Sequence, residues 1–129
     1  MNNDNLANVL SAIDNADRIG KPNSVGQRTS TVVARVLDVL KAEGYVAGYT
    51  VANDGKGGEL TIDLKKAVNR VGAIKPRFAV QADGFTKFEK RYLPAQGFGV
   101  LIVSTPQGIM THTEAKSRNT GGKLLAYCY

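Results

Sequence analysis

The residues with the most chemistry to offer stand in the C-terminal third of the chain. An apolar run there delivers two hydroxyl side chains, Ser104 and Thr105, to a turn that ends at Gly108, and a double glycine, Gly121-Gly122, leads into the last apolar run. Hydroxyls and accessible backbone N–H groups can bind the phosphates, 2′-hydroxyls and base edges of RNA. An isolated Ser-Thr pair is also what an ordinary turn contains, so the pair alone leaves both interpretations open.

Catalysis and metal binding find little support in the composition. The chain has one histidine, His112, and one cysteine, Cys128, which excludes a disulfide framework and a cysteine-built metal site. We interpret His112 as a surface residue of a short helix and Cys128 as a small apolar residue of the closing strand. A general base needs a partner group, and no pattern supplies one. We therefore predict a protein that is not an enzyme and that uses no cofactor and no metal.

The charge is distributed unevenly along the 129 residues. Residues 1–64 contain six Lys/Arg and eight Asp/Glu, whereas residues 65–129 contain eleven Lys/Arg and three Asp/Glu. A basic half predicts a face that meets phosphates, although a basic surface can also serve solubility. The candidates for phosphate contacts are Lys65, Lys66, Arg70, Lys75, Arg77, Lys87, Lys90, Arg91, Arg118 and Lys123.

The first half of the chain predicts two helices on a small antiparallel sheet. Apolar residues recur at helical spacing over residues 6–13, and Asp4 or the residue before it can cap the helix. A second apolar stripe predicts a helix over residues 29–43, with Ser30 or the threonine before it as the N-cap. Two β-rich runs around a glycine-rich turn predict a hairpin of residues 45–51 and 60–64.

The second half predicts a mostly-β arrangement. A basic segment at residues 65–72 indicates the boundary, which gives an N-terminal α/β module at residues 1–66 and a C-terminal module at residues 67–129. The fold class is therefore α+β, with two small α/β modules. The elements expected in the second module are a strand at 74–80, a basic helix or turn at 85–93, a strand at 98–104, a turn at 105–108, a short helix opened by the capping box at 111–114, and a strand at 123–129.

The C-terminal stretch resembles the signature of the ribosomal small-subunit protein eight family. That signature is an apolar strand, Ser-Thr-Ser, a variable residue, Gly-[Ile/Val]-Met, a spacer, Glu-Ala-Arg and a Gly-Gly before the final strand. The resemblance extends to the N-terminus and so covers nearly the whole chain. The matching segments are Asp4-Asn5-Leu6-Ala7, Ile13-Asp14-Asn15-Ala16, Gly20-Lys21, Gly44-Tyr45, Ser104-Thr105, Gly108-Ile109-Met110, Glu114-Ala115 and Gly121-Gly122.

Five positions depart from the family pattern. Pro106 replaces the second serine, which removes a hydroxyl and a backbone donor. Thr31 replaces a usual lysine, and Asn5 stands where proline is common. Lys116 replaces arginine and lacks its bidentate fork. Lys123 follows the double glycine where bacterial members often have Glu.

The resemblance implies a function and a partner. It implies two α/β modules that share an interface and bind directly to helices in the central domain of the small-subunit rRNA, where they support folding and subunit assembly. It also implies neighbouring small-subunit ribosomal proteins as partners, and, as an alternative role, repression of the chain's own messenger RNA. We expect a cytoplasmic protein that is a monomer within the ribosome. The polar N-terminus predicts no signal peptide, and no apolar run approaches the roughly 20 residues that span a bilayer.

The resemblance also implies which residues contact rRNA. Ser104 and Thr105 fall in the family's main RNA-reading loop, and Tyr127 follows the double glycine on the contact strand, where its ring could stack on a base. In the N-terminal module the implied contacts are Asp4, Lys21, Thr29, Ser30 and Thr31. In the C-terminal module they are Ser104, Thr105, Gly108, Gly121 and Gly122, and to these we add Lys123 for its charge and Tyr127 for its ring.

Two other classes of function compete with a ribosomal structural role. A regulatory RNA-binding module outside the ribosome would share the same surface, so only its location in the cell would separate the two. A small enzyme would need a converging set of polar side chains, and the sequence offers none.

Overall fold

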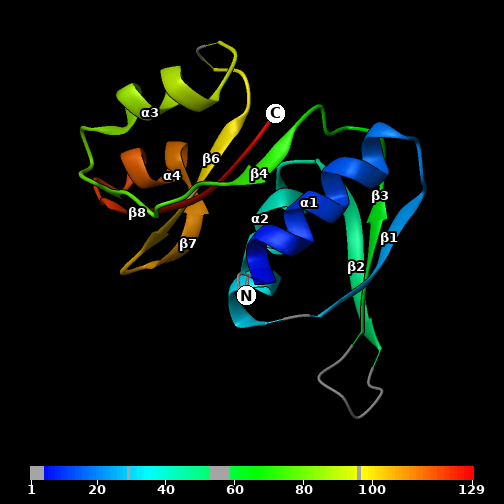
Figure 1. Cartoon of the computed structure of the whole chain (residues 1–129). Coiled ribbons are helices and arrows are strands. Elements are labelled where there is room, and N and C mark those ends of the chain that lie inside the picture. Colours follow the sequence, from blue (N-terminus) through cyan, green and yellow to red (C-terminus); the bar gives the residue numbers. More distant parts are fainter. Residues whose placement is uncertain (1–4, 29, 53–58, 96) are drawn as a thin grey trace. The chain divides into compact units, whose positions relative to one another are not determined.

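The computed structural model describes residues 5–28, 30–52, 59–95 and 97–129. The chain divides into two compact units, unit 1 at residues 1–71 and unit 2 at residues 72–129. Figure 1 labels their helices and strands in chain order. Both units combine helices with antiparallel pairing, so the predicted α+β class is confirmed. None of the described helices is long and apolar enough to cross a membrane.

Unit 1 contains two helices and a three-stranded sheet. The helices are α1 (Asn5–Arg18) and α2 (Thr31–Ala42), and the strands are β1 (Asn23–Arg28), β2 (Val46–Ala52) and β3 (Glu59–Leu64). The strand order is β1-β3-β2, with both pairs antiparallel. The predicted helices and hairpin are present, but the prediction missed β1. Its mostly polar sequence lacks alternation, and only its pairing with β3 makes it a strand.

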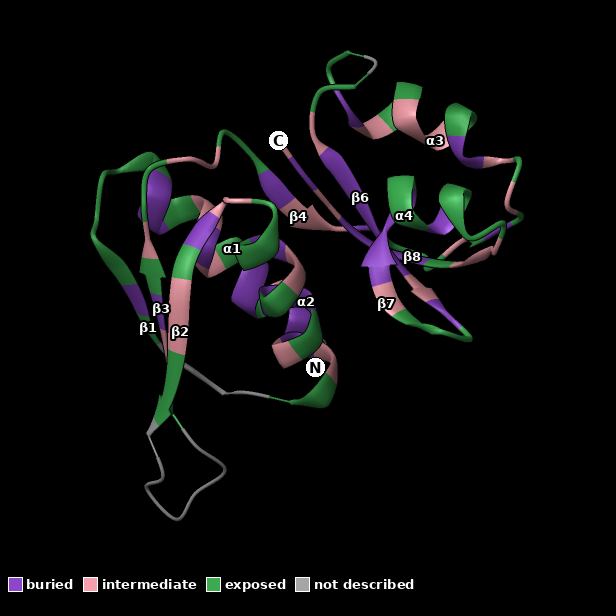
Figure 2. Ribbon diagram, turned by 180° about the vertical axis from the view of Figure 1, so that it is seen from behind, coloured by how far each residue is buried: buried purple, intermediate pink, exposed green. Residues whose placement is uncertain are grey.

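The apolar stripes of the two helices form the core of unit 1. Leu10 and Ile13 of α1, Leu37 of α2 and Ile62 of β3 are fully buried. Figure 2 shows buried, purple bands on both helices. The Ser30 Oγ accepts a hydrogen bond of 3.3 Å from the Val33 N–H and so caps α2, as predicted. The sequence pattern therefore specifies this half of the fold closely.

The segment that follows β3 is fixed to α1 by two carboxylates. The Val68 N–H donates to Asp17 Oδ2 at 2.8 Å, and the Val71 N–H donates to Asp14 Oδ1 at 3.2 Å. The guanidinium of Arg70 also lies 3.4 Å from Asp14. The basic segment at residues 65–72 is therefore anchored to unit 1 along its length rather than left as a loose connection.

Unit 2 is built on a five-stranded sheet. The strands are β4 (Val71–Ala73), β5 (Ala79–Val80), β6 (Val100–Thr105), β7 (Gly108–Thr111) and β8 (Gly122–Cys128). The order is β4-β8-β6-β7, and β5 also pairs with β8. Two helices, α3 (Phe85–Tyr92) and α4 (His112–Ser117), complete the unit (Figure 1). The core that they share with the sheet contains Phe85, Leu101, Val103, Ala115 and Leu124.

Two expectations for unit 2 were wrong. Of the single strand expected at residues 74–80, only residues 79–80 are a strand, β5, while β4 ends just before that range. Pro76 lies between the two strands and has no N–H for a ladder. The expected turn and capped helix are separated by β7. A turn of only two residues, Pro106 and Gln107, returns the chain at once as the second strand of a hairpin with β6.

Candidate nucleic-acid interface

The hairpin of β6 and β7 positions the predicted hydroxyl pair. Thr105 ends β6 and is paired with Gly108, the first residue of β7. The Thr105 hydroxyl donates to the Gly108 carbonyl oxygen at 2.8 Å and accepts from the Gln107 N–H at 3.1 Å. Thr105 is 9% exposed, so its hydroxyl is used to shape the turn. Gly108 has a φ of +123°, a backbone conformation that would be strained in a residue with a side chain.

Ser104 differs from its neighbour in both exposure and bonding. It is half-buried, and within the described part of the chain its hydroxyl makes no hydrogen bond. Across the sheet it is paired with Ile109 of β7 and with Lys123 of β8. The Ser104 hydroxyl therefore remains available to a ligand.

The double glycine lets β8 pass between two other strands. A Cβ at Gly122 would lie 2.1 Å from the Ser104 carbonyl oxygen, and a Cβ at Gly121 would lie 2.3 Å from the Val80 carbonyl oxygen. Both distances are too short for any side chain. The next residue, Lys123, is exposed and is paired with Ser104 on one side and with Ala79 of β5 on the other. Cross-strand partners share a face of a sheet, so the ammonium group and the Ser104 hydroxyl lie on the same face.

Six of the predicted residues thus gather at one end of the sheet of unit 2. We call this group the hairpin-end cluster, and its members are Ser104, Thr105, Gly108, Gly121, Gly122 and Lys123. Tyr127 lies apart from the cluster. It is paired with Leu101, and its ring stacks between Tyr92 at 5.7 Å and Tyr129 at 6.3 Å.

The described residues of the N-terminal group lie at two places in unit 1. Lys21 is exposed and lines a cavity of about 350 Å³ together with Ile19 and Val25. Ser30 and the exposed Thr31 stand at the start of α2. The six-residue strand β1 lies between these places in the chain, a span of about 20 Å. Asp4 and Thr29 lie outside the described residues.

Arg118, at the C-terminal end of α4, contacts the hairpin turn. The Arg118 Nη1 donates to the side-chain oxygen of Gln107 at 3.2 Å, and the Arg118 Nη2 lies 2.9 Å from Glu114. The Thr111 hydroxyl accepts from the Glu114 N–H at 3.2 Å, which confirms the predicted cap. From the sequence, Arg118 was predicted only to contact phosphates. The spacing of four residues from Glu114 was the signal that it also has an intramolecular partner.

The interpretation of His112 as a surface residue was wrong. His112 is 5% exposed, its Nδ1 accepts from the Leu101 N–H at 3.0 Å, and its Nε2 lies 2.8 Å from Glu89 Oε1. Burial lowers the pKa of His112, while the charge of Glu89 acts in the opposite direction. A polar ring can be buried because both nitrogens have partners, and the contact with Glu89 is one that local sequence does not reveal.

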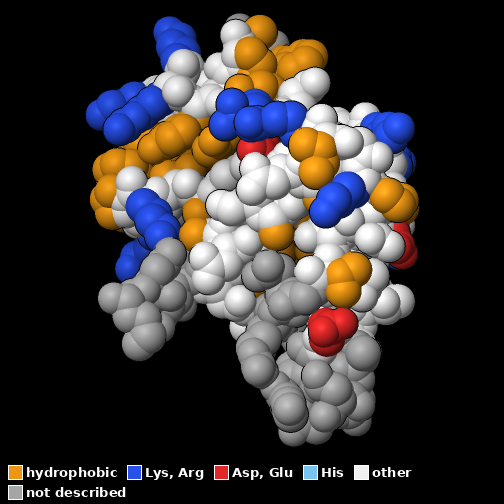
Figure 3. Space-filling model, turned by 45° about the vertical axis from the view of Figure 1, so that its right-hand side comes forward, with side chains coloured by type: hydrophobic (Ala, Val, Ile, Leu, Met, Phe, Trp, Pro, Cys, Tyr) orange, Lys and Arg blue, Asp and Glu red, His pale blue; other side chains and the backbone are white. Residues whose placement is uncertain are grey.

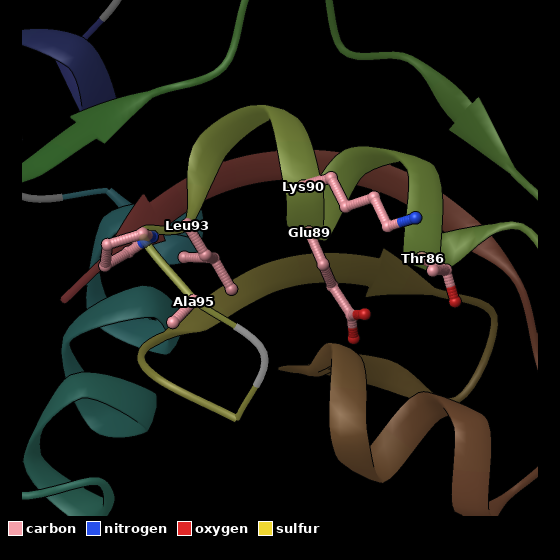
Figure 4. A pocket seen from close by; sticks show the side chains of 6 residues that line it. Thr86, Glu89, Lys90, Leu93 and Ala95 are labelled. Atoms are coloured by element: carbon pink, nitrogen blue, oxygen red, sulfur yellow. The ribbon is translucent and has the colours of Figure 1, made fainter.

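A cavity lies beside Glu89. It measures about 350 Å³ and is lined by Thr86, Glu89, Lys90, Leu93, Pro94 and Ala95. In Figure 4, the Glu89 side chain projects from α3 towards α4, where His112 and Lys116 contact it. Among the residues that the structure describes, no group of three or more His, Cys, Asp or Glu could hold a metal ion.

Two comparisons with known proteins bear on this arrangement. The sequence model of the family described as ribosomal protein S8 matches residues 4–129. The chain is also similar to the small ribosomal subunit protein uS8 of Halorubrum lacusprofundi, with 44% identity over 127 residues and 98% of each chain covered. Both matches include the hairpin-end cluster and the N-terminal group.

Proposed function

Because the chain belongs to the ribosomal protein S8 family, which confirms the predicted family, we propose that it binds the central domain of the small-subunit rRNA directly. As a member of this family it is a constituent of the small subunit of the cytoplasmic ribosome. The rRNA would be its principal partner, neighbouring small-subunit proteins would be the others, and the bound protein would support folding of the rRNA during assembly.

The hairpin-end cluster is the observation that carries the proposal. It places an available hydroxyl on Ser104 beside the exposed ammonium group of Lys123, next to the bare backbone of Gly121 and Gly122. An ammonium group supplies salt-dependent attraction to a phosphate, whereas a hydroxyl and backbone groups can recognise 2′-hydroxyls and base edges. In this proposal Thr105 acts by holding the turn, and Ser104 and Lys123 make the contacts.

Binding to a central-domain rRNA stem, against a scrambled stem over a salt series, tests the proposal. We expect a large preference for the central-domain stem that survives moderate salt. We expect Ser104→Ala to weaken that binding by about fivefold to tenfold, the cost of about one hydrogen bond, without changing the salt slope. Ser11→Ala, at an exposed position of α1, is the matched control. Equal and salt-sensitive binding to both stems would contradict the proposal.

A further inference from the structure

Helix α3 presents a second basic surface. Lys87, Lys90 and Arg91 are exposed and recur at spacings of three and four residues, so they share one side of the helix. Arg91 also contacts the ring of Phe78. We call these three cations the α3 patch. Figure 3 shows lysine and arginine side chains bordering an area of hydrophobic side chains on one face of the molecule.

Aromatic rings contact two cations of the α3 patch, Lys87 and Arg91. The Arg91 guanidinium lies 5.3 Å from the centre of the Phe78 ring and 5.4 Å from that of Tyr92. The Lys87 ammonium lies 5.7 Å from the Phe88 ring, which in turn packs against Phe78 at 5.3 Å. Cations held over ring faces lose little further freedom when they bind an anion, so the surface is preorganised.

The α3 patch keeps a net positive charge. Within the described part of the chain, none of its three cations forms a salt bridge, while Glu89 contacts His112 and Lys116, and Glu114 pairs with Arg118. The third acid of unit 2, the exposed Asp83, precedes α3 and is outnumbered by the patch. Unit 2 contains eight Lys/Arg and three Asp/Glu.

Helix stability does not explain Lys87. It lies in the first turn of α3, where the helix dipole disfavours a cation, whereas Lys90 and Arg91 lie in the last turn, where the dipole favours one.

The α3 patch and the hairpin-end cluster lie on opposite faces of the sheet. Val103 and Leu124 point into the core that contains Phe85 of α3. Ser104 and Lys123 are the adjacent residues on the same strands, and successive side chains of a strand point to opposite faces. A ligand on Ser104 and Lys123 therefore leaves the α3 patch uncovered.

We propose that the α3 patch binds the phosphate backbone of a second RNA segment without reading its bases. The inference rests on the proposed function, because it adds a second contact to an rRNA-binding protein. A polyanion fits the patch better than a protein does, since two of its three cations are lysines, a residue depleted from protein interfaces. The acid of α3, Glu89, contacts His112 and Lys116 and so does not neutralise the patch.

The test uses the full chain with its first site filled. Protein saturated with the central-domain stem is titrated with labelled oligouridylate over a salt series. We expect measurable binding that Lys87→Gln/Arg91→Gln weakens by about tenfold. The log–log salt slope should fall by about 1.4, because each phosphate of a single strand that a cation neutralises contributes about 0.7. Phe78→Leu should weaken binding without changing the slope, because it removes the support of Arg91 and no charge.

Matched controls make the outcome decisive. Arg35→Gln/Lys41→Gln removes the same charge from exposed residues of α2 in unit 1 and should leave oligouridylate binding within about twofold of wild type. An equal loss in both double variants would mean general charge attraction and would overturn the inference. Unchanged oligouridylate binding by Lys87→Gln/Arg91→Gln would also overturn it. The same holds if this double variant loses binding to polyglutamate but not to oligouridylate. If the wild-type protein does not bind the central-domain stem, the proposed function is contradicted. The α3 patch is then tested separately, by titrating the stem-free protein with oligouridylate.

Discussion

Ser104 and Thr105 are adjacent hydroxyl residues with different roles. The Thr105 hydroxyl closes the turn through Gly108 and Gln107, while the Ser104 hydroxyl has no partner within the described residues. Their types and spacing indicated a binding loop, but the division between them depends on which hydroxyl faces the turn. That is set by strand alternation at the last residues of β6.

Replacing Thr105 tests whether this residue acts by shaping the turn or by contacting rRNA directly. We expect Thr105→Val to lower the free energy of unfolding by about 1–2 kcal/mol, because it removes both turn hydrogen bonds and leaves the Gln107 N–H without its acceptor. Specific rRNA binding should weaken as well, with an unchanged salt slope. Urea unfolding and stem binding measure the two effects. Ser104→Ala should affect only binding, so equal stability losses in the two variants would contradict the assignment.

The burial of His112 has a consequence for stability below neutral pH. Because burial lowers its folded-state pKa, the unfolded chain takes up a proton more readily as the pH falls through about 6.5. We therefore expect the free energy of unfolding to decrease with falling pH in this range, by at most about 1.4 kcal/mol per pH unit from this group. Protonation would also disrupt the hydrogen bond from the Leu101 N–H.

The control for this pH dependence is His112→Asn. Its side-chain oxygen can still accept from the Leu101 N–H, but it does not titrate. Urea unfolding between about pH 7.5 and 5.5 should show a steeper loss of stability in wild type than in the variant. Parallel profiles would show that protonation of His112 is not linked to folding.

At the scale of elements, β8 is the strand on which the candidate site depends. It lies beside β5 and β6 at once, and the absence of side chains at Gly121 and Gly122 permits both approaches. The same approach places Lys123 opposite Ser104. The double glycine is therefore a packing requirement that positions a contact residue.

A methyl group at Gly122 should damage this arrangement. We expect Gly122→Ala to lower the free energy of unfolding by about 1–3 kcal/mol and to weaken stem binding, since its Cβ would lie 2.1 Å from the Ser104 carbonyl oxygen. Gly48→Ala in β2 is the matched control, because nothing lies within 4 Å of a Cβ there. Thermal or urea unfolding compares the two, and similar small effects would show that β6 and β8 separate easily.

The predictability of the elements follows from the range of the interactions that form them. Helices α1 and α2 and the hairpin of β2 and β3 were predicted because their stripes and alternation are local. Strand β1 was missed because its residues are mostly polar and its pairing with β3 is a tertiary contact. The burial of His112 depends on Glu89 from another helix, so no local pattern indicated it. In the candidate site, the family motif indicated the cluster, whereas the contact between Arg118 and Gln107 required the structure.

At the scale of the whole molecule, the chain between the two units is held by unit 1. Asp17 and Asp14 of α1 accept the amides of Val68 and Val71. Asp17 is 8% exposed, so this hydrogen bond is sheltered from water. The net positive charge is concentrated beyond this segment, in unit 2.

Removing the Asp17 carboxylate should release this connection. We expect Asp17→Ala to increase hydrogen exchange at the Val68 amide by about tenfold or more and to lower stability by about 1–3 kcal/mol, because a buried donor loses its acceptor. Asp63→Ala, at an exposed position of β3, should leave that amide unchanged. Unaltered exchange in Asp17→Ala would mean that the segment is held by other contacts.

The stacked row of Tyr92, Tyr127 and Tyr129 gives the molecule a natural optical probe. The chain has five tyrosines and no tryptophan, and three of the five stand in this row. Tyrosine emission during denaturation would therefore follow mainly unit 2, whereas far-ultraviolet circular dichroism would follow the helices of both units. Coincident curves would mean that the two units unfold as one cooperative system, and separated curves would assign each its own transition without a label or a mutation.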